Sequence, residues 1–309
     1  MTDRHLDDLA VELPDGRRLA YTDVGDPQGS PVFYFHGNPG SRLECASPVH
    51  AEAFSRAGLR LVSADRPGFG RSDPKRGRRA ADWPSDVVAL ADRLGIDQFA
   101  VLGYSRGGLY ALACAALVPD RITAVGTLSA AGPPDMPGGF IRSMPTRYGR
   151  LSVTLAKRAP RLARSLTRAM RRAGLRDPSV IPRRFKPLLT APADREILRT
   201  AGIDFAARAL LEATRQGPYE TVREQRTMLQ PPGFRLEDVT LAVTLWHGEQ
   251  DSLIPISHSK ELARRLPTAK VVALANVGHL HKPEAIVEIA STLVRKSAVA
   301  PSADRTEAN

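Results

Sequence analysis

Three features are scarce in this 309-residue sequence: cysteine, aromatic residues and long hydrophobic runs. The two cysteines, Cys45 and Cys114, lie in segments with helical patterns, and we expect reduced core residues rather than a disulfide or a metal site. Nowhere do about 18 uncharged apolar residues run together, so the sequence does not support a membrane span. The opening "MTDRHLDDLAVEL" carries both charges and no apolar region typical of a secretion signal. Together these absences favour a cytoplasmic protein.

Lysine is also scarce, whereas arginine is abundant and the net charge is +11. Most of the excess lies in residues 133–217, which hold 16 arginines and 2 lysines against 6 acidic residues. Such a segment can bind nucleic acid or an anionic surface, or it can be a solvated helix face. Because the aromatic residues among these arginines are too few to support stacking on bases, we expect solvated arginines and no nucleic-acid partner.

What the chain does contain is an ordinary globular composition, with 42% hydrophobic and 25% charged residues, at a length that can bury a sizeable core. Its first half alternates strand and helix patterns. A hairpin is predicted over residues 9–25, and buried strands begin near residues 31, 59, 99 and 121. Helices are predicted over residues 42–57 and 83–95 and after residue 107. This alternation predicts an α/β fold with a parallel sheet covered by helices on both faces.

The pattern changes at residues 133–238, where basic helical segments are broken by prolines and no strand is evident. Strand and helix patterns alternate again over residues 241–295. We therefore predict an α/β core of residues 1–132 and 239–296 that carries an all-helical insertion, the cap, at residues 133–238. The small, polar segment 297–309 is predicted to be disordered.

The stretch "FAVLGYSRGGLYALACA", residues 99–115, runs from a short strand pattern through G-x-S-x-G into a helical pattern. Ser105 lies between Gly103 and Gly107, as in a nucleophile elbow, where a sharp turn lifts the serine above the sheet and glycines allow close packing. A serine that merely caps a helix on a glycine turn gives the same short pattern. The motif therefore needs support from residues elsewhere in the chain.

That support comes from two polar residues that directly follow predicted strands. Asp251 lies in "WHGEQDSLIP" and His279 lies in "ANVGHLHKPE". Each alone is typical of a turn or a helix start, but groups at the carboxyl ends of parallel strands meet at one edge of the sheet. With Ser105 they predict a triad in which His279 takes the serine proton and Asp251 orients the imidazole.

Two nearby residues are rivals for these roles. Asp135 ends the strand pattern before the cap and is the alternative acid, although we favour Asp251. His281 lies two residues beyond His279 and is the weaker base, which we expect at the cap boundary or the surface.

A tight turn follows the predicted strand near residue 31, in "FYFHGNPGSR". The backbone N–H of Asn38 can pair with that of Arg106, at the start of the elbow helix, so that both donate to a developing oxyanion. His36 and Gly37 belong to the same turn, and we expect His36 to support it rather than take part in the chemistry. A Gly/Pro turn without this role is the alternative.

Five segments together resemble the α/β-hydrolase superfamily: "HGNPGSRLE", "ADRPGFGRSD", "GYSRGG", "HGEQDSLIP" and "VGHL". The resemblance extends over residues 10–296 and implies a mostly parallel eight-stranded sheet, a helical cap between the sixth and seventh strands, and no cofactor or metal. It also implies that Ser105 is the nucleophile, His279 the general base and then acid, and Asp251 the orienting acid.

The sequence departs from some branches of that superfamily. Its turn is H-G-N-P-G rather than the H-G-G-G of one lipase and esterase branch. Dehalogenases and epoxide hydrolases of the superfamily carry an aspartate at the elbow, so Ser105 argues against both. Arg106 is unusual at a position where small or apolar residues are common, and we expect its side chain in a structural ion pair rather than on a substrate carboxylate.

We therefore expect a serine hydrolase that forms an acyl-enzyme with a small, neutral or weakly polar ester, thioester or amide. An aminopeptidase-like enzyme and a carbon–carbon bond hydrolase use similar sequences. A non-catalytic fold that binds a small molecule and a protein that binds anionic surfaces are further alternatives. The sequence leaves open the acyl and leaving groups and whether the protein forms a homodimer.

The cap is predicted to be mobile and to lie over Ser105, where it sets the choice of substrate. Its apolar residues are expected to rest on the sheet domain, and its arginines to face water. The apolar set is Leu151, Val153, Leu155, Leu162, Leu166 and Met170, and the arginines are Arg158, Arg161, Arg164, Arg168 and Arg171.

Overall fold

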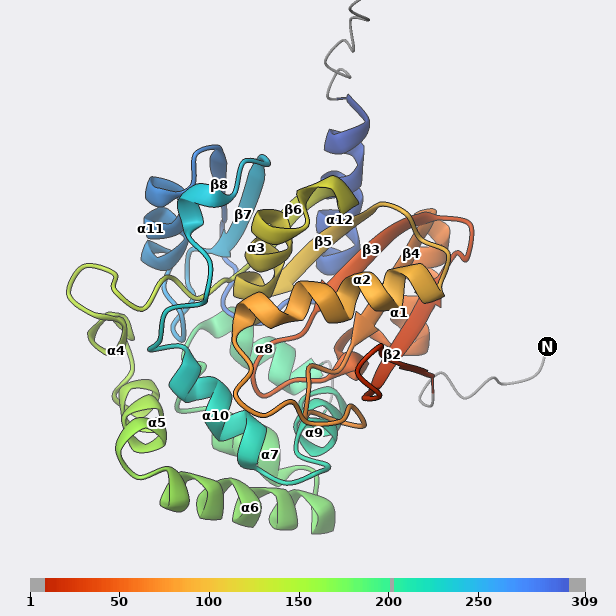
Figure 1. The fold of residues 1–309 in the computed structure, drawn as a ribbon. Helices are drawn as coiled ribbons and strands as arrows, with labels where there is room; N and C mark the ends of the chain where they lie inside the picture. Colours follow the sequence, from red (N-terminus) through yellow and green to blue (C-terminus); the bar gives the residue numbers. More distant parts are fainter. Residues whose placement is uncertain (1–8, 201–202, 300–309) are drawn as a thin grey trace, which may run out of the picture.

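The computed structural model describes residues 9–200 and 203–299, which form one eight-stranded sheet with helices around it (Figure 1). The strands are β1 (Ala10–Glu12), β2 (Arg18–Gly25), β3 (Ser30–Phe35), β4 (Leu59–Ala64), β5 (Phe99–Tyr104), β6 (Ile122–Leu128), β7 (Val243–Gly248) and β8 (Ala269–Leu274). Their order in the sheet is β1-β2-β4-β3-β5-β6-β7-β8. The strands from β3 to β8 run parallel, whereas β1 and β2 form the predicted antiparallel hairpin. The predicted fold class is confirmed.

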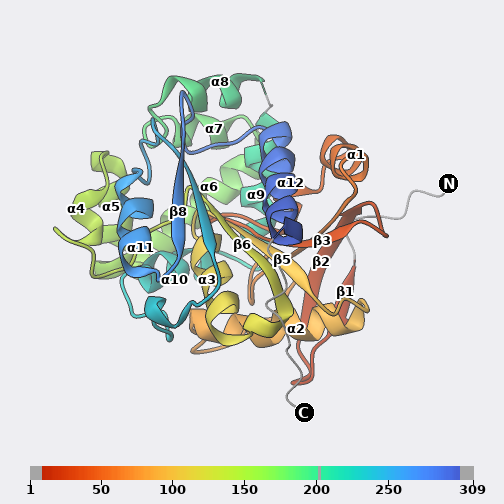
Figure 2. The same ribbon diagram turned by 90° about the horizontal axis from the view of Figure 1, so that it is seen from above.

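Helices cover both faces of the sheet (Figure 2). On one face lie α2 (Trp83–Arg93), α3 (Gly107–Leu117) and α11 (Ser257–Arg265), and on the other lie α1 (Pro48–Arg56) and α12 (Pro283–Val299). Each face has its own hydrophobic core. The sheet is therefore the middle layer of three.

The central strand β5 shows why an uninterrupted apolar run is needed here. Phe99 and Val101 belong to the core under α2 and α3, while Ala100 and Leu102 belong to the core under α1 and α12. All four side chains are buried, because successive residues of a strand face opposite sides and both sides are covered.

The single helix predicted over residues 42–57 is wrong, because two elements lie there. A 3-10 turn, η1 (Arg42–Cys45), ends before α1 begins at Pro48. The side chain of Ser47 accepts the N–H of His50 and caps α1, and Pro48 has no N–H to continue an earlier helix. The other 3-10 turns are η2 (Ala80–Asp82), η3 (Pro119–Arg121) and η4 (Leu236–Asp238).

Two boundaries near the C-terminus also differ from prediction. The strand pattern "KVVALANVG" at residues 270–278 predicts a strand up to about residue 278, but β8 ends at Leu274, since Asn276 adopts a φ of +57° that turns the chain. α12 continues to Val299, past residue 296, because no proline or glycine stops it there. The remainder of the predicted disordered tail, residues 300–309, lies outside the described residues, as do residues 1–8.

The segment between β6 and β7 contains helices and, in its described parts 133–200 and 203–238, no strand. Figure 1 shows these helices gathered at one end of the molecule, away from most of the sheet. They are α4 (Phe140–Ser143), α5 (Arg147–Arg158), α6 (Pro160–Arg176), α7 (Val180–Phe185), α8 (Pro192–Thr200), α9 (Ile203–Ala213) and α10 (Tyr219–Thr227). We keep the name cap for residues 133–238.

Buried ion pairs join α9 and α10 of the cap to the sheet domain. Arg42 Nη1 lies 2.6 Å from Glu212 of α9 and 2.6 Å from Asp65 after β4. Arg78 Nη2 lies 2.8 Å from Glu224 of α10. Because both partners are buried in each pair, removing one would leave an uncompensated charge in the interior.

The outer helices α5 and α6 bury less than predicted. Of the six apolar residues expected to rest on the sheet domain, only Val153 is buried, while Leu151, Leu162 and Leu166 are exposed. Small residues such as Ala163 make the close contacts with the neighbouring helices, so the longer leucines beside them stay uncovered. The five arginines were predicted to face water, and the structure agrees more closely with this prediction. It exposes Arg158, Arg161 and Arg168 fully and Arg164 and Arg171 partly.

Candidate active site

Ser105 lies in the sharp turn between β5 and α3, with a φ of +52° in the left-handed region. This strained conformation is held in place partly by the Ser105 N–H, which donates to Leu128 O at 2.8 Å. A Cβ on Gly107 would overlap the carbonyl oxygen of Phe35, and a Cβ on Gly103 would overlap that of Gly107. Only glycines therefore permit the close packing that holds Ser105 at the carboxyl edge of the sheet.

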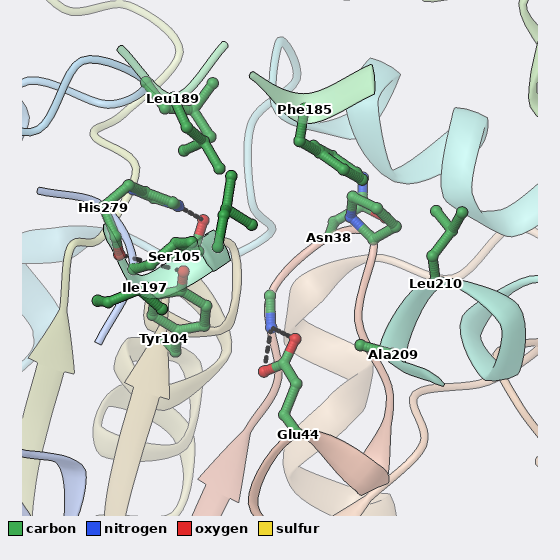
Figure 3. Close-up of a pocket in the computed structure, with 15 residues that line it drawn as sticks. Asn38, Glu44, Tyr104, Ser105, Phe185, Leu189, Ile197, Ala209, Leu210 and His279 are labelled. Carbon is green, nitrogen blue, oxygen red and sulfur yellow. Dashed lines mark hydrogen bonds between the residues drawn. The ribbon is translucent and has the colours of Figure 1, made fainter. Parts of the chain in front are cut away.

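The structure brings Ser105, Asp251 and His279 together from three strand ends. Ser105 Oγ lies 3.1 Å from His279 Nε2, and His279 Nδ1 lies 2.7 Å from Asp251 Oδ2 (Figure 3 shows the Ser105 contact). The backbone N–H groups of Leu253 and Ile254 donate to Asp251 Oδ1 at 2.9 and 2.8 Å. A carboxylate at Nδ1 favours the tautomer whose Nε2 can accept a proton from the serine.

The charges around His279 set its protonation. Burial lowers the pKa of His279, but the charge and hydrogen bond of Asp251, with a contribution from Asp194, outweigh it and the net shift is upward. Burial alone would raise the pKa of Asp251, yet attraction to His279 and a hydrogen bond with His247 bring it well below its usual range. The pair is therefore a carboxylate beside a readily protonated imidazole.

Asp194 is a site residue that sequence reasoning missed. It comes from α8 of the cap and is fully buried. Its carboxylate accepts the backbone N–H groups of His279 at 3.1 Å and Leu280 at 2.7 Å, so a cap helix holds the loop that carries the imidazole. No local pattern marks it, because an acidic residue in the first turn of a helix is common for reasons of its own.

Glu44 is a second residue that was missed, although it lies within the segment "HGNPGSRLE". Its buried carboxyl accepts the N–H of Gly37 at 3.1 and 3.2 Å (Figure 3) and the hydroxyl of Tyr34 at 3.1 Å. Burial, only partly offset by these hydrogen bonds, raises the pKa of Glu44 to about 7. Glu44 therefore changes charge near neutral pH within the wall of the site.

His36 lies behind the turn and is fully buried. Its Nδ1 lies 2.9 Å from Gly37 O, and its Nε2 accepts the Arg66 N–H at 3.2 Å. Burial and the charge of Arg66 hold the pKa of His36 well below its usual range. A neutral imidazole bonded in this way supports the turn.

The alternative acid, Asp135, and the alternative base, His281, lie outside the chain of contacts from Ser105 to Asp251. Asp135 is 70% exposed at its side chain and pairs with Arg265 at 2.8 Å, so the structure does not bring it to His279. His281 was expected at the cap boundary or surface. It is buried rather than at the surface, with Nε2 3.0 Å from Ser129 Oγ, and it lines a cavity together with Ala193 and Ile197 of α8, at the boundary with the cap. The loop after β8 turns inward at this point, and the hydroxyl of Ser129 compensates for burial of the ring.

Asn38 and Arg106, whose N–H groups were predicted to receive the oxyanion, line one cavity together with Ser105. Their side chains are engaged elsewhere. Asn38 Nδ2 donates to Thr221 O at 3.1 Å. Arg106 Nε lies 3.5 Å from Glu224, the structural ion pair expected of this side chain. Only the backbone of these two residues is thus available to a reacting group.

Two cavities meet at Ser105. The small cavity, about 110 Å³, is lined by Ser105, His279, Glu44 and apolar cap residues such as Phe185 and Leu189 (Figure 3). The large cavity, about 620 Å³, extends from Ser105 to α5 and α6. Its lining is mostly apolar and includes Leu151, Met170 and Met228. The site can therefore hold an apolar group of considerable size beside the serine.

A comparison of the sequence with known protein families agrees with this fold and site. The family model described as alpha/beta hydrolase fold matches residues 30–284 of the chain. The chain belongs to that family. This alpha/beta hydrolase carries, within its described residues, no cluster of three His, Cys, Asp or Glu side chains that could hold a metal ion. Its described helices include none that is long and apolar enough to cross a membrane.

Curated relatives of this alpha/beta hydrolase differ in activity. The dihydrolipoyllysine-residue acetyltransferase component of the acetoin cleaving system of Pseudomonas putida is 27% identical over 276 residues, 89% of this chain and 65% of that protein. A probable proline iminopeptidase of Streptomyces coelicolor is 32% identical over 121 residues, 37% of this chain and 36% of that protein. The chain thus matches less than two thirds of the length of either relative.

Solved structures confirm the fold of this alpha/beta hydrolase. An esterase from Thermogutta terrifontis has a TM-score of 0.67 and 21% identity, with 94% of this chain and 98% of that chain covered. A meta-cleavage product hydrolase from Pseudomonas fluorescens has a TM-score of 0.67 and 18% identity, with 94% and 98% covered. Identities this low support the fold and leave the substrate open.

Proposed function

We propose that this alpha/beta hydrolase is a serine hydrolase that acts through an acyl-enzyme intermediate on an ester, thioester or amide. The observation that carries the proposal is the chain of contacts from Ser105 through His279 to Asp251, at the floor of an apolar cavity. A serine hydroxyl becomes a useful nucleophile only when such a base accepts its proton.

In the first half-reaction, Ser105 Oγ attacks the carbonyl carbon while His279 Nε2 takes the hydroxyl proton. The carbonyl oxygen becomes an oxyanion, which the backbone N–H groups of Asn38 and Arg106 stabilise. Collapse of this intermediate breaks the bond to the leaving group, and His279 returns the proton to it. The acyl group is then an ester of Ser105.

In the second half-reaction, a water molecule gives a proton to His279 and attacks the acyl-enzyme carbon. The second oxyanion collapses, the bond to Ser105 Oγ breaks, and His279 returns the proton to the serine. The carboxylic acid is released, and Asp251 stays ionised throughout because it only orients and stabilises the imidazolium.

A second candidate is release of the N-terminal residue of a peptide. One observation favours it: the Glu44 carboxyl lies in the wall of the small cavity with Ser105, where an ionised form can attract a substrate ammonium group. Proline iminopeptidases are also among the relatives. An aminoacyl anilide therefore belongs in the substrate panel.

The test is a panel of chromogenic esters of graded chain length, one thioester and one aminoacyl anilide, together with labelling by a fluorophosphonate probe. Ser105→Ala should abolish labelling and turnover without lowering the melting temperature, and His279→Ala should be about as damaging. Ser85→Ala, an exposed serine of α2, is the matched control and should behave as the wild type. Near-wild-type turnover in a folded Ser105→Ala variant would refute the assignment.

A further inference from the structure

Large apolar side chains on the surface are concentrated on two cap helices. Eight are exposed among the described residues, and five of these lie on α5 and α6, each between 51% and 61% exposed. Figure 1 shows both helices at the outer edge of the cap. Large uncovered apolar side chains concentrated on two neighbouring helices are unusual and indicate an interaction site. The five are Tyr148, Leu151, Leu162, Leu166 and Leu175.

The same helices carry a dense positive charge. Residues 136–176 contain no aspartate or glutamate, while residues 147–176 contain 9 arginines and 1 lysine. None of these ten cations forms an ion pair with a carboxylate in the part of the chain that the structure describes. Arg161, Arg168 and Arg172 recur at helical spacing and are exposed together, beside the leucine side of α6.

This combination is typical of a helix that lies in the plane of a membrane interface. Such helices have arginines and lysines on one face, leucines and aromatics on the other, and a composition that is polar on the whole. Both α5 and α6 are rich in arginine and polar on the whole, and on α6 Leu162 and Leu166 lie on a side of the helix separate from that of the exposed arginines. Leu175 lies on the arginine side of α6. The two helices would rest at the headgroup level, with Leu162 and Leu166 directed to the acyl chains and the guanidinium groups to anionic headgroups.

The apolar surface is continuous with the large cavity. Tyr148, Leu151 and Leu166 are exposed and also line the cavity that ends at Ser105. A chain that leaves the lipid layer at α5 and α6 can therefore reach the serine between apolar walls. No crossing of a polar surface is needed.

We propose that α5 and α6 dock this protein on an anionic lipid bilayer and admit an amphiphilic substrate from it to Ser105. The admission step rests on the proposed hydrolase function, whereas docking does not. Nucleic acid is disfavoured because, on α6, leucines rather than aromatics separate the arginines. A symmetric dimer through this surface is disfavoured because it would bring two such positive surfaces together.

Docking is tested by sedimentation of the full-length protein with vesicles of phosphatidylcholine alone and with equimolar phosphatidylglycerol. We expect at least about tenfold tighter binding to the anionic vesicles, weakening as salt rises. The triple variant Arg161→Gln, Arg168→Gln, Arg172→Gln should lose about a hundredfold in affinity. The variant Leu162→Gln should lose about tenfold. None of these four residues lines either cavity.

The control has the same loss of charge elsewhere: Arg18→Gln, Arg76→Gln, Arg93→Gln, three exposed arginines outside the cap. It should keep most of the vesicle affinity, and a loss equal to that of the α6 triple variant would mean that net charge alone is responsible. Equal binding of the wild type to both vesicles, tighter binding to duplex DNA, or a dimer that the leucine variant dissociates would each overturn the proposal.

Activity separates the two proposals. Ser105→Ala should bind vesicles as the wild type does, so docking can be measured without turnover. The α6 variants should hydrolyse a dispersed short ester normally but a vesicle-bound ester more slowly, in proportion to their lost binding. Docking without hydrolysis of any ester, thioester or amide in the panel would support the membrane surface and refute the hydrolase. Hydrolysis of the vesicle-bound ester at an unchanged rate in undocked variants would refute admission from the bilayer.

Discussion

At the scale of single residues, the proposed chemistry depends on the charges that face His279. The Asp251 carboxylate at 2.7 Å and the more distant Asp194 both favour the imidazolium that forms when Ser105 loses its proton. Burial opposes them, since it disfavours any charge. The proposed reactivity of Ser105 therefore depends on two opposing effects on the pKa of His279: the nearby carboxylates raise it and burial lowers it.

Asp251→Asn tests this balance through pH. His279 must be neutral to act as a base, so wild-type activity should fall as pH drops through a pKa above the usual value of 6.5. Without the carboxylate that pKa is lower, so the acid limb of kcat/KM should move to lower pH. The plateau of kcat should fall by a factor of about a thousand or more, because the neutral amide favours the wrong tautomer. Profiles of kcat and of kcat/KM from about pH 5 to 9 measure the two effects.

Asp135→Asn is the matched control for that experiment. Its carboxylate is exposed and pairs with Arg265, so both the profile and the plateau should be unchanged. If Asp135→Asn lost activity and Asp251→Asn kept it, the acid would be misassigned.

Glu44→Gln tests the second carboxyl of the site through stability. A buried Glu44 whose pKa is raised to about 7 stabilises the fold fully below its unfolded value of 4.5, and that contribution is lost as pH rises through 7. Glutamine has no such dependence. The unfolding free energy of the variant relative to the wild type should therefore increase by about 2 kcal/mol between pH 5 and pH 8.

Urea denaturation of both proteins at the two pH values checks this expectation. Glu237→Gln, at an exposed position, serves as the control. A relative stability of Glu44→Gln that does not vary with pH would show that Glu44 remains ionised in the folded protein.

At the scale of elements, α10 holds the cap to the sheet domain through Glu224. This buried carboxylate lies near three arginines that come from the sheet domain. Burial alone would raise the pKa of Glu224, but the three positive charges bring it well below its usual range. The three are Arg66, Arg78 and Arg106.

Glu224→Gln should therefore be strongly destabilising. It keeps the shape of the side chain but leaves three buried guanidinium groups short of negative charge, which should cost about 3 to 5 kcal/mol of unfolding free energy. Chemical denaturation near neutral pH measures the loss. Glu237→Gln again provides the comparison, because its pair with Arg235 is exposed and should be worth less than about 1 kcal/mol. Similar small losses in both variants would contradict the anchoring role of α10.

At the scale of the whole molecule, the fraction of buried residues differs between the tightly packed sheet domain and the lightly packed outer helices of the cap. α3 has eight buried residues among its 11, whereas α6 has two, Ala163 and Gly174, among its 17. Helices with few buried contacts open locally at a lower free energy than core helices. The predicted mobility of the cap should therefore be concentrated in its outer helices.

Hydrogen exchange followed by mass spectrometry tests this division. Amides of α6 should exchange faster than those of α3, and α10 should be protected more than α6 because of its buried ion pairs. Anionic vesicles should slow exchange in α5 and α6 only. Protection of α6 equal to that of α3 in the free protein would show that the cap is as firmly held as the core.

Much of this architecture follows from local pattern. The apolar run of β5, the glycines around Ser105 and the alternation of strands with helices each reflect a requirement of nearby backbone, so they are visible in short windows. Chain order then limits the topology, because parallel strands connected by helices bring their carboxyl ends to one edge. This is why the sequence alone predicts that Ser105, Asp251 and His279 meet.

Only the tertiary structure shows that Glu44 and Asp194 belong to the site and that Glu224 joins the cap to the sheet domain. Each is a carboxylate whose local sequence is ordinary, and each matters because of a partner it meets in space: Gly37 N–H, His279 N–H and three arginines. The exposure of Leu162 and Leu166 was likewise decided by packing, since helical periodicity defines an apolar face without saying what covers it. A pattern along the chain specifies which faces need a partner, whereas the partners themselves are set by contacts between residues far apart in sequence.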